Sequence, residues 1–239
     1  MRSTLIRSFA VAAFAVSSFV AQAAPTPSYT TFGTLAGATF GGTGIPNNAV
    51  AITTIGGFTM GLTANQRYVG PNLANNGAGT FYAAPGNATP AGSTFDGSFW
   101  NFAYYLSGDT LGYNFKLFYD VDPSAGTDYG VVTANGGGAA QVTTQDSQNL
   151  MFNLGQSSFQ YATGFTAPAG TFDPNVAGQY NFALVAYSAA TGAEVGRSSI
   201  NVIVGQPAAV PEPATIALFG LGLFGVAATR RKSKKATRA

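Results

Sequence analysis

The chain has 239 residues, no cysteine and no histidine, and only 8% charged residues, with a formal net charge of +2 at pH 7. Without cysteine there is neither a disulfide framework nor a thiolate metal site, and without histidine the commonest general base and transition-metal ligand are missing. Thiol proteases, histidine-dependent triads and the usual zinc enzymes are therefore excluded.

The start of the chain has the pattern of a secretory signal peptide. Two arginines precede the apolar run 9–20, and Ala21 and Ala23 flank one residue, which is the small-x-small pattern of a cleavage site. We expect export through the secretory translocon and cutting by signal peptidase between Ala23 and Ala24, so that 1–23 is the signal peptide. An uncleaved anchor is the alternative, although this run is short for a spanning helix.

The body of the chain is acidic. Of the eleven Lys and Arg residues, two lie in 1–23 and six in 230–239, which leaves three against eight of the nine acids, a formal charge of 3 − 8 = −5. Nucleic acid is not expected as a partner, because phosphate backbones are bound by clusters of Lys and Arg. We assign 24–206 to one extracytoplasmic domain.

This domain is expected to be all-β, because it combines little charge with many turn-forming residues and abundant Phe and Tyr. From Tyr113 to Val121 every second residue is apolar, which predicts a half-buried strand with polar residues such as Asp120 on the other face. The aromatic run Phe99–Leu106 predicts another strand. The turn residues 107–110 between them predict an antiparallel hairpin.

A second hairpin is predicted at the end of the domain. Tyr180–Tyr187 and Val195–Val204 are joined by turn residues at 190–192. This pair resembles the last two strands of bacterial immunoglobulin-like modules. Its inward-facing set is expected to include Phe182, Leu184, Ile200, Val202 and Val204.

Weaker strand patterns complete the domain. Strands of this number and spacing, without a long helical period, predict an antiparallel β-sandwich of immunoglobulin-like or jelly-roll topology, and the sequence does not choose between the two. The weaker candidates are Tyr29–Leu35, Ala49–Ile55, Gly79–Tyr82, Asp128–Thr133 and Asn149–Leu154.

An acidic cluster follows the strongest predicted strand. Oxygen-rich loops of this kind bind calcium, and Asp120, Asp122 and Asp128 would be the ligands. The loop departs from the EF-hand pattern, since Pro123 interrupts the spacing and no acid stands at the twelfth position. The alternative is a turn in which the carboxylates cap local amides. Calcium is the only cofactor considered.

Trp100 and Tyr104 have the same parity on one predicted strand and so share a sheet face. If this face is exposed, the two rings are suited to stacking on the sugars of an exopolysaccharide. The alternative is burial in the sandwich core, where large aromatic residues usually lie.

No catalytic residue is assigned, and we expect a protein that is not an enzyme. A glycosidase needs only two facing carboxylates, but nothing in the spacing of the acids selects a pair. A calcium- or carbohydrate-binding adhesin is the second interpretation, and a secreted hydrolase that uses two carboxylates is the third.

The end of the chain has three parts in order. Val210-Pro211-Glu212-Pro213 closes a linker, 207–213; an uncharged apolar run, 214–229, is a predicted transmembrane helix; and 230–239 is a basic tail. At about 1.5 Å per residue the helix would be about 24 Å long, somewhat short of a hydrocarbon core of about 30 Å. The tail, which begins with Arg230, Arg231 and Lys232, is expected to stay in the cytoplasm.

These three parts, over 210–235, resemble the PEP-CTERM sorting signal of Gram-negative bacteria, a tail that also carries the label ice-binding protein C-terminal domain. The resemblance implies that an exosortase, a membrane-embedded transpeptidase, cuts near Pro211–Pro213. It further implies a precursor anchored in the inner membrane and facing the periplasm. The product would then be a cell-surface or extracellular-matrix protein, associated with biofilm or exopolysaccharide.

Overall fold

The structure is a computed structural model that describes residues 25–42, 44–66, 73–89, 96–124, 129–133, 141–148 and 172–205. The regular secondary structure within these segments consists of β-strands, as the composition predicted. The expected signal peptide, the expected transmembrane helix and the candidate strand Asn149–Leu154 lie outside the described residues.

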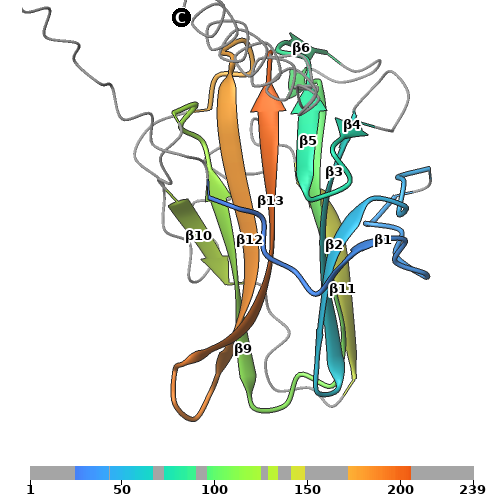
Figure 1. Cartoon of the computed structure of the whole chain (residues 1–239), viewed down its shortest axis with the longest axis vertical. Helices are drawn as coiled ribbons and strands as arrows, with labels where there is room; N and C mark the ends of the chain where they lie inside the picture. Colours follow the sequence, from blue (N-terminus) through green and yellow to red (C-terminus); the bar gives the residue numbers. More distant parts are fainter. Residues whose placement is uncertain are drawn as a thin grey trace, which may run out of the picture.

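The strands form two large sheets and one small sheet (Figure 1). The five-stranded sheet A has the order β1-β2-β3-β8-β11, with β1 at Thr31–Gly33, β2 at Val50–Ile55, β3 at Phe58–Gln66, β8 at Trp100–Gly108 and β11 at Val142–Gln148. The six-stranded sheet B has the order β10-β9-β12-β13-β5-β4, with β10 at Tyr129–Thr133, β9 at Tyr113–Asp120, β12 at Gly178–Ser188, β13 at Glu194–Val204, β5 at Thr80–Ala83 and β4 at Ala74–Asn75. The small sheet pairs β6, Asn87–Ala88, with β7, Gly97–Ser98.

The described strand pairings are antiparallel except for that of β5 with β13, which is parallel. A parallel pair needs a long connection between its strands. Here that connection contains most of the domain, because β5 comes early in the chain and β13 is the last described strand. The pairing therefore ties the early part of the chain to its end.

The inner faces of sheets A and B bury one continuous apolar core. The Phe102 ring of sheet A stacks on the Phe182 ring of sheet B at a centroid distance of 4.2 Å, and Phe58 meets Phe115 edge to face at 5.0 Å. Aromatic pairs in these geometries add to the free energy gained by burial. Strand residues of the core from sheet B include Phe115, Leu117, Tyr119, Phe182, Leu184, Ile200, Val202 and Val204.

A second, smaller core covers the outer face of sheet A. The segment between β1 and β2 folds over this face and buries Ala38 and Phe40 against Val50 and Ala103. Phe40 has a positive φ of 49°, which is costly for a residue with a bulky side chain. The Gln145 side chain holds the segment in place, because its Oε1 accepts hydrogen bonds from the backbone N–H groups of Thr39 and Phe40, at 2.8 and 2.7 Å.

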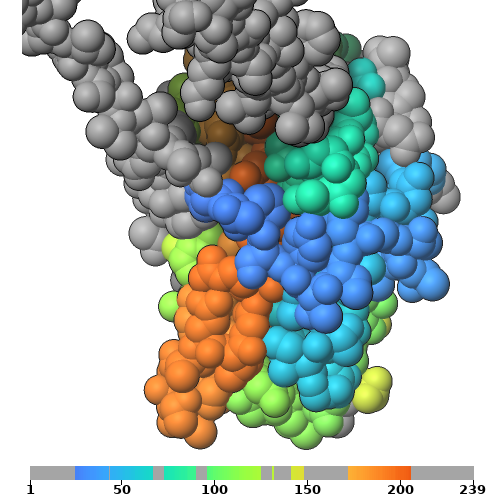
Figure 2. Space-filling model, in the orientation of Figure 1, coloured from blue at the N-terminus to red at the C-terminus, as the bar shows by residue number. Residues whose placement is uncertain are grey.

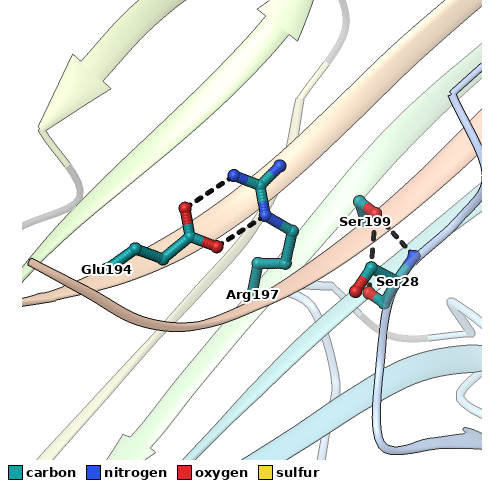
Figure 3. Close-up of polar contacts among 4 residues, drawn as sticks. All are labelled: Ser28, Glu194, Arg197 and Ser199. Atoms are coloured by element: carbon teal, nitrogen blue, oxygen red, sulfur yellow. Dashed lines mark hydrogen bonds and ion pairs between the residues drawn. The ribbon is translucent and has the colours of Figure 1, made fainter.

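The predicted closing hairpin is confirmed as β12 and β13, and its five expected inward residues all lie in the core. The register shifts between Ala186 and Tyr187, because Val195 is an extra residue on β13. This bulge brings Glu194 and Arg197 to the same side of the strand, where they form a two-bond ion pair with both distances 2.7 Å (Figure 3). Both side chains are more than one third exposed, so the pair adds at most about 1 kcal/mol to stability.

The predicted hairpin of Phe99–Leu106 with Tyr113–Val121 is wrong. Both strands exist, as β8 and β9, but β8 pairs with β3 and β11 in sheet A, whereas β9 pairs with β10 and β12 in sheet B. The short turn between them crosses from one sheet to the other. Two strands that face each other across a core have the same periodicity as two strands of a hairpin, so the pattern alone does not separate these cases.

Two strands of sheet A, β3 and β11, are not among those predicted from the sequence. β3 does carry a period-two signal, since Phe58, Met60, Leu62 and Ala64 alternate and are all buried in the core. β11 has no such signal, because its sequence is mostly Thr, Gln, Asp and Ser. It is placed by its ladder with β8 rather than by an apolar face.

The N-terminal segment 25–30 closes one edge of the sandwich. Two hydrogen bonds join this segment to β13: Ser199 N–H donates to Ser28 O at 2.8 Å, and Ser28 N–H donates to Ser199 Oγ at 2.7 Å. Figure 3 shows the contacts of the Ser199 hydroxyl with Ser28. The Asn201 amide donates to Pro25 O at 2.8 Å, and Thr30 N–H donates to Ile52 O of sheet A at 2.8 Å. Figure 2 shows the segment, in blue, lying across the orange strands toward sheet A. We call it the strap.

Replacement of Asn201 by alanine should loosen the strap. The variant loses the amide donor to Pro25 O at a position that is almost fully buried, so we expect the free energy of unfolding to fall by about 1–2 kcal/mol. Guanidinium denaturation followed by tryptophan fluorescence measures this change. Asn175→Ala, at an exposed turn, is the matched control and should change it by less than about 0.5 kcal/mol; equal effects of the two variants would contradict the role of the strap.

Gly108 and Gly112, before β9, both have a positive φ, but only Gly108 also lies in close contact with another part of the backbone. Gly108 has φ of +117° and an added Cβ would lie 2.2 Å from Gly57 O, whereas Gly112 has φ of +80° with no atom within 4 Å. Gly112→Ala should therefore cost only about 1 kcal/mol of stability. Gly108→Ala should cost about 2–4 kcal/mol, because a clash between β8 and the β2–β3 turn is added to the strain. Thermal unfolding of both variants checks the difference, and a Gly108→Ala protein as stable as Gly112→Ala would contradict it.

Candidate functional site

The last described strand leads directly into the predicted sorting segment. β13 ends at Val204 between its neighbours β12 and β5, and Gly205 N–H continues the pairing by donating to Ala83 O at 2.9 Å. Residues 206–210, which follow, can span at most about 18 Å of extended chain before Pro211. β13 stops at one end of the sandwich (Figure 1). The residues that carry Val210 to Pro213 and then Arg230, Arg231 and Lys232 follow it in the sequence. All of these residues, like Ala21, Ala23 and Ala24 at the other terminus, lie outside the described residues.

The candidate calcium loop begins with a buried carboxylate. Asp120 lies on the outer face of sheet B, as the period-two pattern predicts, yet its exposed fraction is 0%. Its Oδ2 accepts a hydrogen bond from the Asn181 amide at 3.3 Å, and Asn181 Oδ1 in turn accepts one from the Gln179 amide at 3.1 Å. Asn181 is paired in register with Asn201, the residue that holds the strap. A polar row on the outer face is thus covered rather than solvated, which periodicity alone does not reveal.

Burial controls the ionisation of this carboxyl. Loss of hydration raises the pKa of Asp120 to about 7, although hydrogen bonds from the Asp122 N–H and from Asn181 favour the charged form and oppose the shift. Within the described residues neither Lys nor Arg forms an ion pair with it; the one ion pair found there joins Arg197 to Glu194. Around neutral pH this site therefore changes its charge.

The two aspartates of the loop that the structure describes cap local amides. Asp122 N–H donates to Asp120 Oδ1 at 2.9 Å, and Ser124 N–H donates to Asp122 Oδ1 at 2.7 Å. These bonds are the ones expected from the alternative interpretation, a turn shaped by its carboxylates. Asp128 lies outside the described residues, and among those described no three acidic residues are close enough to hold a metal ion. Calcium binding by the full set stays a prediction.

Two further aspartates accept hydrogen bonds from backbone amides at other turns. Asp109 Oδ1 accepts from Leu111 N–H at 3.0 Å, and Asp173 Oδ1 accepts from Asn175 N–H at 2.9 Å. In each case the amide belongs to the residue two positions further on, which is the Asx-turn geometry. Acids placed just after strands are a sequence signal for such turns.

Trp100 and Tyr104 both face the core side of sheet A, which confirms that they share a sheet face. The exposed fraction of Trp100 is 1%, and its ring lies 5.7, 5.5 and 5.9 Å from those of Phe172, Tyr180 and Phe182. The indole is packed on these three rings, so it does not present a surface for sugar stacking. Tyr104 is partly buried against the same core, and burial is the main cause that raises its pKa.

Comparison with known proteins identifies the end of the chain. Residues 209–232 match the family described as the PEP-CTERM protein-sorting motif, in agreement with the resemblance of 210–235. The match supports an exported protein that is sorted through an exosortase-type enzyme and transiently anchored in the membrane. No curated protein and no solved structure matches the chain. None of the described segments forms a helix long and apolar enough to cross a membrane.

The Asp120 carboxyl makes stability depend on pH. Its pKa in the folded protein, about 7, lies above the unfolded value of about 3.9, so the folded state holds the proton more tightly. The resulting stabilisation is complete below about pH 4 and is lost as pH rises through about 7. Asp120→Asn, which keeps an acceptor for Asp122 N–H, should melt at a higher temperature than the wild type at about pH 8, and the difference should vanish toward about pH 4.

Melting temperatures across this pH range measure the effect. Asp173→Asn replaces an exposed aspartate that also caps a turn, so it controls for the general effect of removing an acid. If Asp120→Asn and the wild type kept the same difference in melting temperature at every pH, the buried carboxyl would not be the titrating group.

Proposed function

We propose that the protein is a non-enzymatic component of the cell surface or extracellular matrix, exported as a membrane-anchored precursor and released from its anchor by an exosortase-like transpeptidase. The observation that carries the proposal is the PEP-CTERM sorting motif at 209–232, which begins shortly after the last strand of a folded domain. A Gram-negative host, a periplasm-facing precursor and an association with biofilm exopolysaccharide belong to this proposal.

The position of the motif supports processing after folding. β13 is an interior strand of sheet B, and both of its neighbours and the strap are attached to it. The described pairings of β13 therefore end at Gly205, before the motif begins. Cutting near Pro211–Pro213 removes none of the described core residues, so we expect the released domain to keep its fold.

The residue inventory supports a role without catalysis. The whole chain lacks histidine and cysteine, which leaves carboxylates as the common catalytic groups. Four of the aspartates in the described part, at positions 109, 120, 122 and 173, accept hydrogen bonds from backbone amides in turns. A carboxylate that shapes a turn already has a structural role, and a structural role is what we propose for these four aspartates.

Replacement of Pro211, Glu212 and Pro213 by alanine tests the sorting step. The triple variant should be retained as the uncut precursor in the membrane fraction, because the extended, anionic segment that the enzyme would recognise is lost. Intact mass spectrometry of the protein from membrane and extracellular fractions measures the cut. Pro207→Ala is the matched control, since it removes a proline just outside the 209–232 match, and it should be processed normally. Normal processing and release of the triple variant would overturn the proposal.

A further inference from the structure

A cavity opens at the edge of the sandwich where the two sheets end in very short strands. β1 has three residues and β4 has two, and Figure 1 shows both on the same side of the molecule. Neither strand is long enough to cover the gap between the sheets. The result is a cavity of about 450 Å³ lined by residues of β1, β3, β4 and the segment before β2, which is within the range of about 300–1,000 Å³ typical of small-molecule sites.

The described lining is neutral. Among the described residues that line the cavity, none is Lys, Arg, Asp or Glu. A charged ligand would lose hydration in such a site without gaining a partner of opposite charge, which is unfavourable. The cavity is therefore suited to an uncharged ligand.

Amide and hydroxyl groups supply its hydrogen-bonding capacity. The Asn75 side chain is fixed by its own turn, because its Oδ1 accepts from Gly77 N–H at 3.0 Å and its Nδ2 donates to Leu73 O at 3.4 Å. One donor hydrogen and one lone pair of this amide remain for a ligand. Asn48 is exposed, and its amide makes no hydrogen bond within the described residues. An amide offers a donor and an acceptor side by side, which matches neighbouring hydroxyl groups.

An aromatic ring forms the apolar part of the lining. Phe32 is half-buried, and its ring is held 5.7 Å from that of Tyr29 and 6.1 Å from that of Phe81. Leu73 lies across the cavity on the sheet B side. A held ring beside neutral amides suits a ligand that has both an apolar C–H face and several hydroxyl groups.

We propose that this cavity binds a neutral saccharide. Among uncharged ligands, a sugar ring combines a C–H face for Phe32 with adjacent hydroxyl groups for Asn48 and Asn75. The site differs from the one expected at Trp100, which lies inside the core. Saccharide binding at this cavity is independent of the sorting of the protein. The two can be tested separately, because binding is measured on the purified chain and sorting is measured by the location of the protein in the cell.

Filling the cavity provides the sharpest test. Gly33 lines it, its φ is not in the left-handed region, and an added Cβ would meet no atom within 4 Å. Leucine at this position should therefore occupy open space beside the ligand without distorting β1. Asn48→Ala removes the exposed amide proposed to bind the ligand. Thr31→Val is the control, because it changes an exposed residue of the same strand that does not line the cavity.

Saturation-transfer difference NMR on the full-length chain measures binding. The chain is held in dodecylphosphocholine, a detergent without a sugar head group, and is titrated with cellobiose, maltose and lactose, with glucuronic acid as the charged comparison. At least one neutral disaccharide should bind and glucuronic acid should not. Asn48→Ala should raise the Kd roughly fivefold or more, because about one hydrogen bond is lost. Gly33→Leu should raise the Kd by at least as much, because its side chain fills space that the ligand would occupy. Thr31→Val should leave the Kd unchanged.

Circular dichroism and melting temperature establish that each variant is folded. Absence of transfer to all three disaccharides, or an unchanged Kd in folded Gly33→Leu, overturns the proposal. If Gly33→Leu does not fold, Asn48→Ala decides the matter, because it changes an exposed side chain; an unchanged Kd in this variant overturns the proposal as well.

Discussion

The stacking of Phe182 against the opposite sheet is the contact on which the domain depends. This ring lies on β12 near the middle of sheet B, and it touches Phe102 at 4.2 Å and Trp100 at 5.9 Å from sheet A. The chain has no cysteine, so the two sheets are held by burial and hydrogen bonds rather than by a disulfide. In a sandwich of this kind the inner faces supply most of the favourable free energy of folding.

β13 connects this core to the strap at one end of the domain and to the sorting motif at the other. Its inward residues Ile200, Val202 and Val204 belong to the core, while Ser199 and Asn201 hold the strap at the N-terminal end of the domain. Its own end leads to the sorting motif. The two ends of the domain, next to the expected cut by signal peptidase and the proposed cut by exosortase, are therefore both fixed to the same strand. The contacts described for this strand are made by residues that lie between the two cuts.

The polar row of Asp120, Asn181 and Asn201 shows how an outer face of a sheet becomes an interior. The pattern of alternation predicts that these residues point away from the core, and they do, but all three are almost fully buried. A buried aspartate with hydrogen bonds and no ion pair in the described part of the chain is tolerated because it can take up a proton. The cavity between β1 and β4 is the opposite case, since short edge strands leave neutral side chains accessible between the sheets.

The sequence by itself determined the features that depend on neighbouring residues. The alternation in β9, β12 and β13 and the order of proline motif, apolar run and basic tail at 210–235 are local patterns. For Asp122 the sequence left calcium binding and turn capping open, and the structure shows the capping bond from Ser124 N–H. Only the tertiary structure decided which strands pair. It separated β8 from β9, paired β5 with β13 in parallel, placed Trp100 in the core and buried Asp120. Period-two alternation indicates that a strand has one buried face. It does not indicate which strands lie beside it, because strand pairing depends on how the buried faces of all the strands fill one core. The contacts in that core join residues that are far apart in the chain.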